Sequence, residues 1–316
     1  MNFSGLITNF GPLTVTGLAQ GAIIALFALG YTLVYGVLRL INFAHSEVFV
    51  TGTFLTLIVW GWFGLNQNSQ TPSTVVVIAY LLLGLAVAIV ASGTTALLVE
   101  LIAYRPLRRR NAPPLAFLIT AIGASLAISE TVGAFTHRNP HGMPPLIVQK
   151  SVITVGNTSI TNLQILIIAL ALIMMFALDR FINRSRLGRG IRAVAQNPDS
   201  AALMGVNKGR VISLVFLLGG LMAGIAAVMY DMKIGVTRFD AGFLLGIEAF
   251  TAAVMGGIGN LRGALLGGLL LGLLQNYAAG LFGTEWLHAV AFVLLVLILL
   301  IRPTGLLGES LGKARA

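Results

Sequence analysis

The sequence predicts an all-α polytopic membrane protein that crosses the bilayer about nine times. Of its 316 residues, 57% are hydrophobic and only 9% are charged, whereas a soluble globular protein carries about 25% charged residues. A single soluble core cannot bury so much apolar surface, and a disordered chain would show the opposite composition. The chain contains no cysteine, which excludes disulfides, thiolate catalysis and cysteine-ligated metal sites.

Nine apolar stretches are long enough, or nearly long enough, to form spanning helices, which need about 20 mostly apolar residues. The first is long enough to be tilted or broken, the ninth is short, and the glycine-rich seventh can form two half-helices. We therefore expect eight to ten spans. In chain order the stretches are residues 12–38, 44–63, 74–102, 113–136, 162–179, 211–230, 241–259, 263–281 and 286–301.

The Lys and Arg residues predict the orientation of the chain. With nine spans, sixteen of the 20 basic residues fall in one set of loops and four in the other. Cytoplasmic loops carry the excess of positive charge, so we place the N-terminus outside and the C-terminus in the cytoplasm. We expect residues 1–316 to form a single transmembrane domain. The basic residues are confined to short stretches and form no basic face, so we expect no nucleic-acid partner.

Two loops are too long to be simple turns. The outer loop, residues 137–161, begins with prolines and glycines and can end in a small hairpin around Gly156-Asn157. The inner loop, residues 180–210, is rich in arginine and contains the sequence Asn197-Pro198-Asp199. Asparagine caps helices, proline suits the first helical position, and aspartate complements the positive end of the helix dipole.

The inner loop is therefore expected to contain a short helix over 198–204, with Gly205 as the residue that ends it. Small and apolar residues are unusual in a solvated loop, and this helix contains Ala201, Ala202, Leu203 and Met204. Such a compact apolar face suits a groove on another protein. The alternative is a membrane-surface helix, in which the neighbouring arginines set the topology and meet anionic lipid.

Ionisable residues within spans are candidates for function, because burying them in lipid is costly. Glu47 follows Asn42 and His45 at the start of the second span, Glu130 lies in the fourth, and Glu248 lies in the middle of the seventh. Each can line a pathway or can form a structural hydrogen bond between helices.

Two other carboxylates are assigned to local pairs. Glu100 is expected to pair with Arg105, and His288 with Glu285 is expected to form an ordinary interface contact.

Glycines recur at a spacing of four, at Gly220/Gly224, Gly242/Gly246, Gly263/Gly267 and Gly268/Gly272. This spacing allows helices to approach closely, and we expect packing to account for most of it. The run from Gly256 to Asn260 is richer in glycine and favours an unwound segment, which in transporters often lines the path.

The sequence shows no motif for chemistry of its own. The ATP-binding motif G-x-x-x-x-G-K-[ST] is absent. His137 and His141 are separated by Pro140 and have no third ligand nearby, so we expect no metal site. No set of nucleophile and base favours an intramembrane enzyme.

Four segments together resemble the permeases of the branched-chain amino acid family of ABC importers, and most closely the shorter kind of these permeases. The segments are residues 30–54, 185–230, 246–275 and 302–308, which follow one another in the order of the family. The second contains the loop helix, and the third contains the glycine-rich run. The chain departs from the family pattern at Ser46, where glycine is common, and at Glu248, where many members carry lysine.

This resemblance implies a subunit of an importer in the bacterial cytoplasmic (inner) membrane. The other subunits would be a second, related permease, two cytoplasmic ATPases that bind ATP and magnesium, and an extracytoplasmic binding protein. This chain would need no cofactor and would not be an enzyme. The substrate would be a branched-chain or other neutral amino acid, with urea or a short amide as the alternative within the family. A different alternative is an ion-coupled secondary carrier that uses the intramembrane carboxylates and needs no ATPase.

The resemblance also assigns roles to residues. The loop helix would be the coupling helix that docks on the ATPase, formed by Asn197, Pro198, Asp199, Ala201, Ala202, Leu203, Met204 and Gly205. Substrate would pass near the second and seventh spans. The residues expected along this path are Asn42, His45, Glu47, Glu248, Thr251, Gly256, Gly257 and Asn260.

Overall fold

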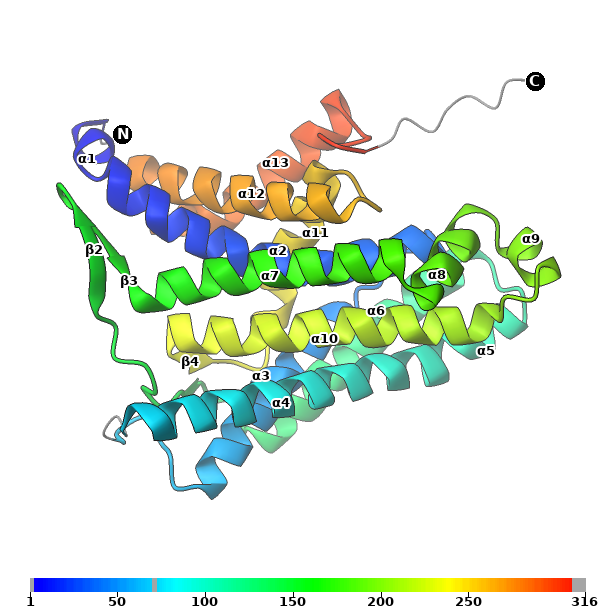
Figure 1. The fold of residues 1–316 in the computed structure, drawn as a ribbon, viewed down its shortest axis with the longest axis horizontal. Coiled ribbons are helices and arrows are strands. Elements are labelled where there is room, and N and C mark those ends of the chain that lie inside the picture. Colours follow the sequence, from blue (N-terminus) through cyan, green and yellow to red (C-terminus); the bar gives the residue numbers. More distant parts are fainter. Residues whose placement is uncertain (1–2, 70–72, 309–316) are drawn as a thin grey trace. The chain divides into compact units, whose positions relative to one another are not determined.

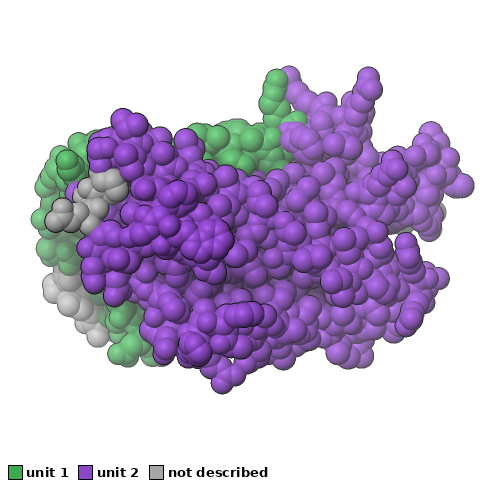
Figure 2. Space-filling model, turned by 90° about the horizontal axis from the view of Figure 1, so that it is seen from below, with its two compact units in different colours: residues 1–32, 150–180, 247–316 green, residues 33–149, 181–246 purple. Residues whose placement is uncertain are grey.

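The computed structural model of the chain describes residues 3–69 and 73–308 and is predominantly helical (Figure 1). The described chain divides into two compact units, coloured in Figure 2. Unit 1 comprises residues 1–32, 150–180 and 247–316, and unit 2 comprises residues 33–149 and 181–246. Three helices, α2 (Phe10–Leu38), α7 (Asn162–Arg184) and α11 (Ala241–Gly256), run from one unit into the other.

Each unit has its own set of further elements. Those of unit 1 are α1 (Phe3–Thr8), β2 (Ser151–Val155), β3 (Thr158–Thr161), α12 (Leu261–Phe282), the 3-10 turn η2 (Thr284–Trp286) and α13 (Leu287–Ile301). Those of unit 2 are α3 (His45–Trp62), α4 (Thr74–Leu98), the π-helical turn η1 (Val99–Tyr104), α5 (Arg105–Arg109), α6 (Pro114–Phe135), β1 (His141–Gly142), α8 (Arg186–Gln196), α9 (Pro198–Leu203), α10 (Lys208–Ile234) and β4 (Val236–Thr237).

All nine predicted spans are helices, and the prediction of an all-α polytopic membrane protein is confirmed. Seven helical segments among the described residues are long and apolar enough to cross a membrane: α2, the continuous helix from α4 to α5, α6, α7, α10, α12 and α13 with η2. The other two predicted spans correspond to α3 and α11, which are helices but do not belong to these seven segments. α11 is short, with 16 residues. It is one continuous helix, so the expectation of two half-helices in the seventh span is wrong.

Close packing explains the spaced glycines. In unit 1, α12 crosses α2 so closely that a Cβ atom on Gly272 would lie 2.3 Å from the backbone nitrogen of Gly21. In unit 2, α10 packs along α4 (Figure 1), and a Cβ atom on Gly224 would lie 2.5 Å from the carbonyl oxygen of Ala88. Glycine is required at these positions because backbone meets backbone there, which is the use of small residues expected in membrane helix pairs.

The third span continues further than predicted. The expected end at residue 102 is wrong, because the helix runs through η1 and α5 to Arg109. Pro106 lies in the first turn of α5 and cannot donate a backbone hydrogen bond. The π-helical turn η1, Val99–Tyr104, lies directly before α5.

The outer loop contains the predicted hairpin. β2 pairs with β3 in antiparallel fashion, and Gly156 at the turn has a φ of 58°, a left-handed value that suits glycine. The same loop also provides β1, which pairs with β4 through His141 and Thr237. The loops at 137–161 and 235–240, both predicted to lie outside, are therefore joined.

Basic loops predicted to be cytoplasmic also come together within each unit. In unit 2, residues 105–111 and residues 194–213 line one pocket. In unit 1, Arg262 Nη2 lies 3.1 Å from Asp179 Oδ2. These pairings agree with the predicted grouping of loops, whereas the direction of the chain across the membrane remains a prediction. Two of the sixteen residues counted for that prediction, Lys313 and Arg315, lie outside the described residues.

Candidate functional site

The inner loop presents the predicted short helix on its surface. Asn197 caps α9 by accepting hydrogen bonds from the backbone nitrogens of Asp199 and Ser200, both at 3.0 Å. The helix ends at Leu203, one residue earlier than predicted, and Gly205 follows with a left-handed φ of 82°. The predicted cap, helix and terminating glycine are therefore confirmed.

One side of α9 is buried and the other side is exposed. Ala201 is buried, whereas Ala202, Leu203 and Met204 are exposed, the last two by 89% and 85%. Asp199 Oδ1 accepts a hydrogen bond of 2.7 Å from Lys208 Nζ at the start of α10. This ammonium group lowers the pKa of the Asp199 carboxyl below its ordinary value.

A second helix of the inner loop, α8, was not predicted from the sequence. Ser185 caps it by accepting a hydrogen bond of 2.8 Å from the backbone nitrogen of Gly188. Gly188 is needed there because a Cβ atom would lie 2.2 Å from the carbonyl oxygen of Ile182 at the end of α7. The buried Ile191 and Val194 form its apolar face. The signal was present as the serine cap followed by apolar residues at helical spacing.

The start of α3 forms a buried polar cluster in unit 2. Glu47 is buried, and its Oε1 accepts hydrogen bonds from the hydroxyls of Ser46 at 3.3 Å and Ser125 at 3.4 Å. Its Oε2 is buried and has no partner among residues 3–69 and 73–308. Because buried carboxylate oxygens are normally hydrogen-bonded, Oε2 marks a place where water or a polar ligand is expected.

Asn42 and His45, which shortly precede Glu47 in the sequence, are also buried. Asn42 Oδ1 accepts a hydrogen bond of 3.1 Å from the hydroxyl of Tyr104, and the backbone nitrogen of His45 donates to the carbonyl oxygen of Asn42 at 3.1 Å. These bonds connect the α2–α3 turn to the helix that contains η1. They give both residues a positioning role, and their contact with a substrate remains a prediction.

Glu248 lies at the centre of a second polar cluster, in unit 1. Its Oε1 accepts a hydrogen bond of 2.9 Å from Gln275 Nε2 of α12, and His288 Nδ1 of α13 lies 2.8 Å from the same oxygen. Within the described chain, Glu248 Oε2 and Gln275 Oε1 are buried and have no partner. The cluster therefore holds two buried oxygens that can accept hydrogen bonds.

The partners of Glu248 correct an earlier expectation. His288 contacts Glu248 and not its neighbour in the sequence, Glu285, which is exposed. Gln275 was not singled out from the sequence either, although an amide within an apolar span is a detectable signal.

Asp231 of α10 was also missed. Both of its carboxylate oxygens are buried without a hydrogen-bond partner in the part of the chain that the structure describes.

The remaining predicted path residues have structural contacts. Thr251 donates to the carbonyl oxygen of Ile247 at 2.8 Å within its own helix. The glycine-rich run is the turn between α11 and α12, where Gly257 has a φ of 105°. Asn260 caps α12, accepting from the backbone nitrogens of Arg262 at 3.0 Å and Gly263 at 3.1 Å.

This turn also holds the end of the described chain. Asn260 Nδ2 donates to the carbonyl oxygen of Leu307 at 2.9 Å, and the backbone nitrogen of Leu307 donates to Gly256 at 2.9 Å. The segment is unwound, as predicted, and its contacts anchor residues 302–308. A place for Gly256, Gly257 and Asn260 in the substrate path remains a prediction.

Two further carboxylates are paired. Glu100 is fully buried and accepts from Arg105 Nη2 at 3.0 Å, as predicted, and also from Arg108 Nη2 at 2.7 Å. Glu130 is exposed and pairs with Arg138. No group of three or more His, Cys, Asp or Glu side chains that could hold a metal is found among the described residues.

Comparison with known proteins gives concordant matches over nearly the whole chain. A family model described as "Branched-chain amino acid transport system / permease component" matches residues 13–299. The chain is 40% identical to the high-affinity branched-chain amino acid transport system permease protein BraD of Pseudomonas aeruginosa, over 93% of this chain and 94% of that protein. It is 38% identical to the corresponding permease protein LivH of Escherichia coli K12, with the same coverage.

Among solved structures, PsaBC from Streptococcus pneumoniae in complex with Fab matches with a TM-score of 0.51. The match covers 96% of this chain and 97% of that one at 11% sequence identity. At this identity the match supports a shared fold.

Proposed function

Because the chain belongs to the family of branched-chain amino acid transport permeases, we propose that it is the membrane permease subunit of an ATP-driven importer for branched-chain or other neutral amino acids. The observation that carries the proposal is the family match over residues 13–299. The chain contains no ATP-binding motif, so ATP and magnesium would be bound by two partner ATPases. We place the importer in a bacterial inner membrane, with a second, related permease beside this chain and a binding protein outside.

The geometry of α9 supports its assignment as the coupling helix. Its apolar tip, Leu203 and Met204, is exposed, and its base is held by the Asn197 cap and the Asp199–Lys208 ion pair. α8 adds a second, well-packed helix to the same loop. A short helix fixed at one end and apolar at the other can enter a groove on the ATPase and transmit its movement to α10.

The substrate path would use the buried carboxylates. Glu47 and Glu248 each have one oxygen held by hydrogen bonds and one oxygen without a partner among the described residues. A neutral amino acid has an ammonium group, which can donate a hydrogen bond to such an oxygen. Apolar walls would accommodate its side chain.

The outer hairpin offers a surface for the binding protein. Val152 and Val155 of β2 project apolar side chains into solvent, and both strands belong to the loop predicted to lie outside. This assignment rests on the predicted orientation.

Reconstitution tests the proposal. The chain, its partner permease and the ATPases in proteoliposomes should take up leucine only when ATP and the binding protein are both supplied. Uptake by the chain alone, driven by an ion gradient, would refute the ATP-driven mechanism and favour the secondary carrier. A ligand screen on the binding protein distinguishes the amino acids from urea and short amides.

A further inference from the structure

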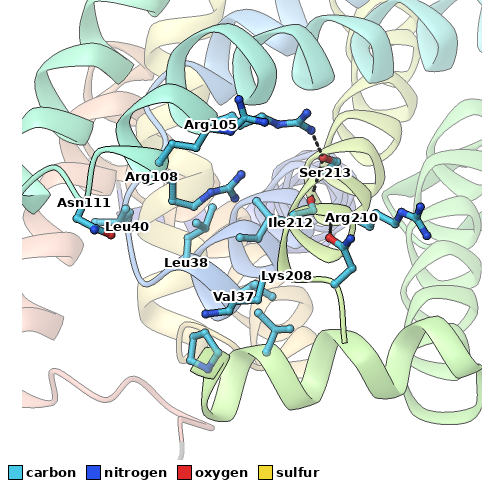
Figure 3. Close-up of a pocket in the computed structure, with 15 residues that line it drawn as sticks. Val37, Leu38, Leu40, Arg105, Arg108, Asn111, Lys208, Arg210, Ile212 and Ser213 are labelled. Carbon is cyan, nitrogen blue, oxygen red and sulfur yellow. Dashed lines mark hydrogen bonds between the residues drawn. The ribbon is translucent and has the colours of Figure 1, made fainter. Parts of the chain in front are cut away.

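Unit 2 contains a pocket of about 840 Å³ beside the proposed coupling helix α9, and the proposed transport mechanism assigns no ligand to it. It lies where the end of α2, the helix end at α5, and the start of α10 meet, with Pro198 of α9 at its edge. Figure 3 shows the guanidinium groups of Arg105 and Arg108 extending toward Ile212 and Ser213. The volume lies within the range of ligand-binding pockets.

The lining of the pocket is strongly basic. It includes Arg105, Arg108, Arg109 and Lys208, and no Asp or Glu is among the lining residues. Arg210 also belongs to the lining, but Figure 3 shows its guanidinium extending away from Arg105 and Arg108. We therefore leave Arg210 out of the proposed contacts.

Nearby carboxylates neutralise only part of this charge. Glu100 pairs with Arg105 and Arg108, and Asp199 pairs with Lys208. With Arg210 left out, two carboxylates against four cations leave a net charge of +2 at the pocket. The side chain of Arg109 is exposed and has no ion-pair or hydrogen-bond partner in the described part of the structure.

Arg108 provides an independent indication of a ligand. Its Nη2 donates to Glu100 at 2.7 Å, whereas its Nη1 is buried and has no partner among the described residues. A buried guanidinium nitrogen needs an acceptor, because its N–H groups have lost water without gaining a protein partner. An anion in the pocket would supply that acceptor.

We propose that this pocket binds the phosphate group of an anionic ligand. Arginine is suited to phosphate because its planar fork can donate two parallel hydrogen bonds. The neighbouring wall is apolar, formed by Val37, Leu38 and Ile212, and the pocket lies at the ends of membrane-spanning helices. These features fit an anionic phospholipid, with the headgroup at the arginines and the glycerol and acyl carbons at the wall. A small soluble phosphate shares the same chemistry at the arginines.

Binding of defined probes to the purified full-length chain tests the proposal. Native mass spectrometry would compare short-chain phosphatidylglycerol with phosphatidylcholine of the same chain length, and glycerol 3-phosphate would serve as the soluble probe. We expect phosphatidylglycerol to bind at least tenfold more tightly than phosphatidylcholine. If glycerol 3-phosphate binds as tightly as phosphatidylglycerol, the ligand is a soluble phosphate; if it binds at least tenfold more weakly, the ligand is a lipid.

Two variants and a matched control make the test specific. R109Q changes an exposed arginine outside the Glu100 network, and R108Q removes the buried donor; each should weaken phosphatidylglycerol binding at least fivefold. R110Q removes the same charge from the next residue, which is not part of the lining, and should change the affinity less than twofold.

Unchanged phosphatidylglycerol binding in R109Q and R108Q would overturn the proposal, and so would equal affinity for phosphatidylcholine. If both variants instead lose the co-purifying ATPase and retain lipid binding, the pocket is a protein contact and the proposal is wrong. R109Q keeps the test informative if R108Q does not fold, because Arg109 makes no hydrogen bond to the buried Glu100 among the described residues.

Discussion

Shortening Leu203 or Met204 to alanine should weaken the binding of the ATPase without disturbing the permease. The two side chains are 89% and 85% exposed, so the isolated permease loses almost no packing when they are truncated. Substitutions at such positions usually change the free energy of unfolding by less than about 0.5 kcal/mol. The proposed complex, in contrast, would bury both side chains in a groove of the ATPase.

The size of the effect follows from the area that docking would remove from water. Leucine to alanine removes three carbons, each worth about 0.8 kcal/mol when buried. With 89% of Leu203 available for burial in the complex, the loss is about 2 kcal/mol, or about a 30-fold weaker dissociation constant. Met204 should behave similarly. The double variant need not show the sum, because adjacent residues share contacts.

The assay is the dissociation constant of the purified ATPase for the permease held in nanodiscs. V155A is the matched control, since Val155 is 68% exposed on the outer hairpin and lies on the side predicted to face away from the ATPase. Each variant should keep the melting temperature of the wild-type permease. Dissociation constants of L203A and M204A within twofold of the wild-type value would refute the assignment of α9 as the docking helix.

Three further predictions concern packing, the Glu248 cluster and α9. G272A should lower the free energy of unfolding by about 1–3 kcal/mol, since the new Cβ must move about 1 Å from Gly21. In G123A the new Cβ meets nothing within 4 Å, and because alanine is favoured over glycine inside a helix this variant should be slightly more stable than the wild type. Equal melting temperatures of the two variants would contradict the packing. E248Q keeps an acceptor for its two donors, so it should fold while leucine uptake in proteoliposomes falls at least tenfold; normal uptake would make Glu248 structural. The pKa of the Asp199 carboxyl should lie below its ordinary value when measured by carbon NMR, and the ion pair, complete at neutral pH, should be lost as the pH falls through this lowered pKa. In K208M the pKa should rise toward the ordinary aspartate value, and an unchanged pKa would exclude Lys208 as the cause.

The spans were predictable because length and apolarity are local properties of the sequence. The ends of the spans were less predictable. Arg105, Arg108 and Arg109 were assigned to a loop on account of their charge, yet the helix continues through them to Arg109, because backbone hydrogen bonds do not depend on the charge of the side chains. α8 was not predicted either, because its arginines interrupt the apolar pattern to which Ile191 and Val194 belong.

In the candidate sites, too, contacts between residues close in the sequence could be predicted, whereas contacts between distant helices could not. Asn197 could be assigned as a cap, and Glu100 as the partner of Arg105, because each contact joins residues close in the sequence. The partners of Glu248 come from two other helices, 27 and 40 residues further along the chain. Such contacts depend on how α11, α12 and α13 pack, and one sequence contains no direct signal of that packing. The nearest histidine–glutamate pair in the sequence, His288 with Glu285, was therefore the wrong choice.

Whether a carboxylate pairs with a lysine or arginine divides the acidic residues into two groups. The chain has only 10 acidic residues, and Glu100, Glu130, Asp179, Asp199 and Asp240 each form an ion pair with a lysine or arginine. Glu47, Asp231 and Glu248 form no ion pair with Lys or Arg among the described residues, although all three are buried.

Each of these three also has at least one carboxylate oxygen without a hydrogen-bond partner in the described chain. An unsatisfied buried polar atom costs about 1–3 kcal/mol, so a hydrogen-bond donor from water or a ligand is expected at each of these oxygens. Glu47, Asp231 and Glu248 are therefore the residues whose neutralisation should change transport more than it changes folding.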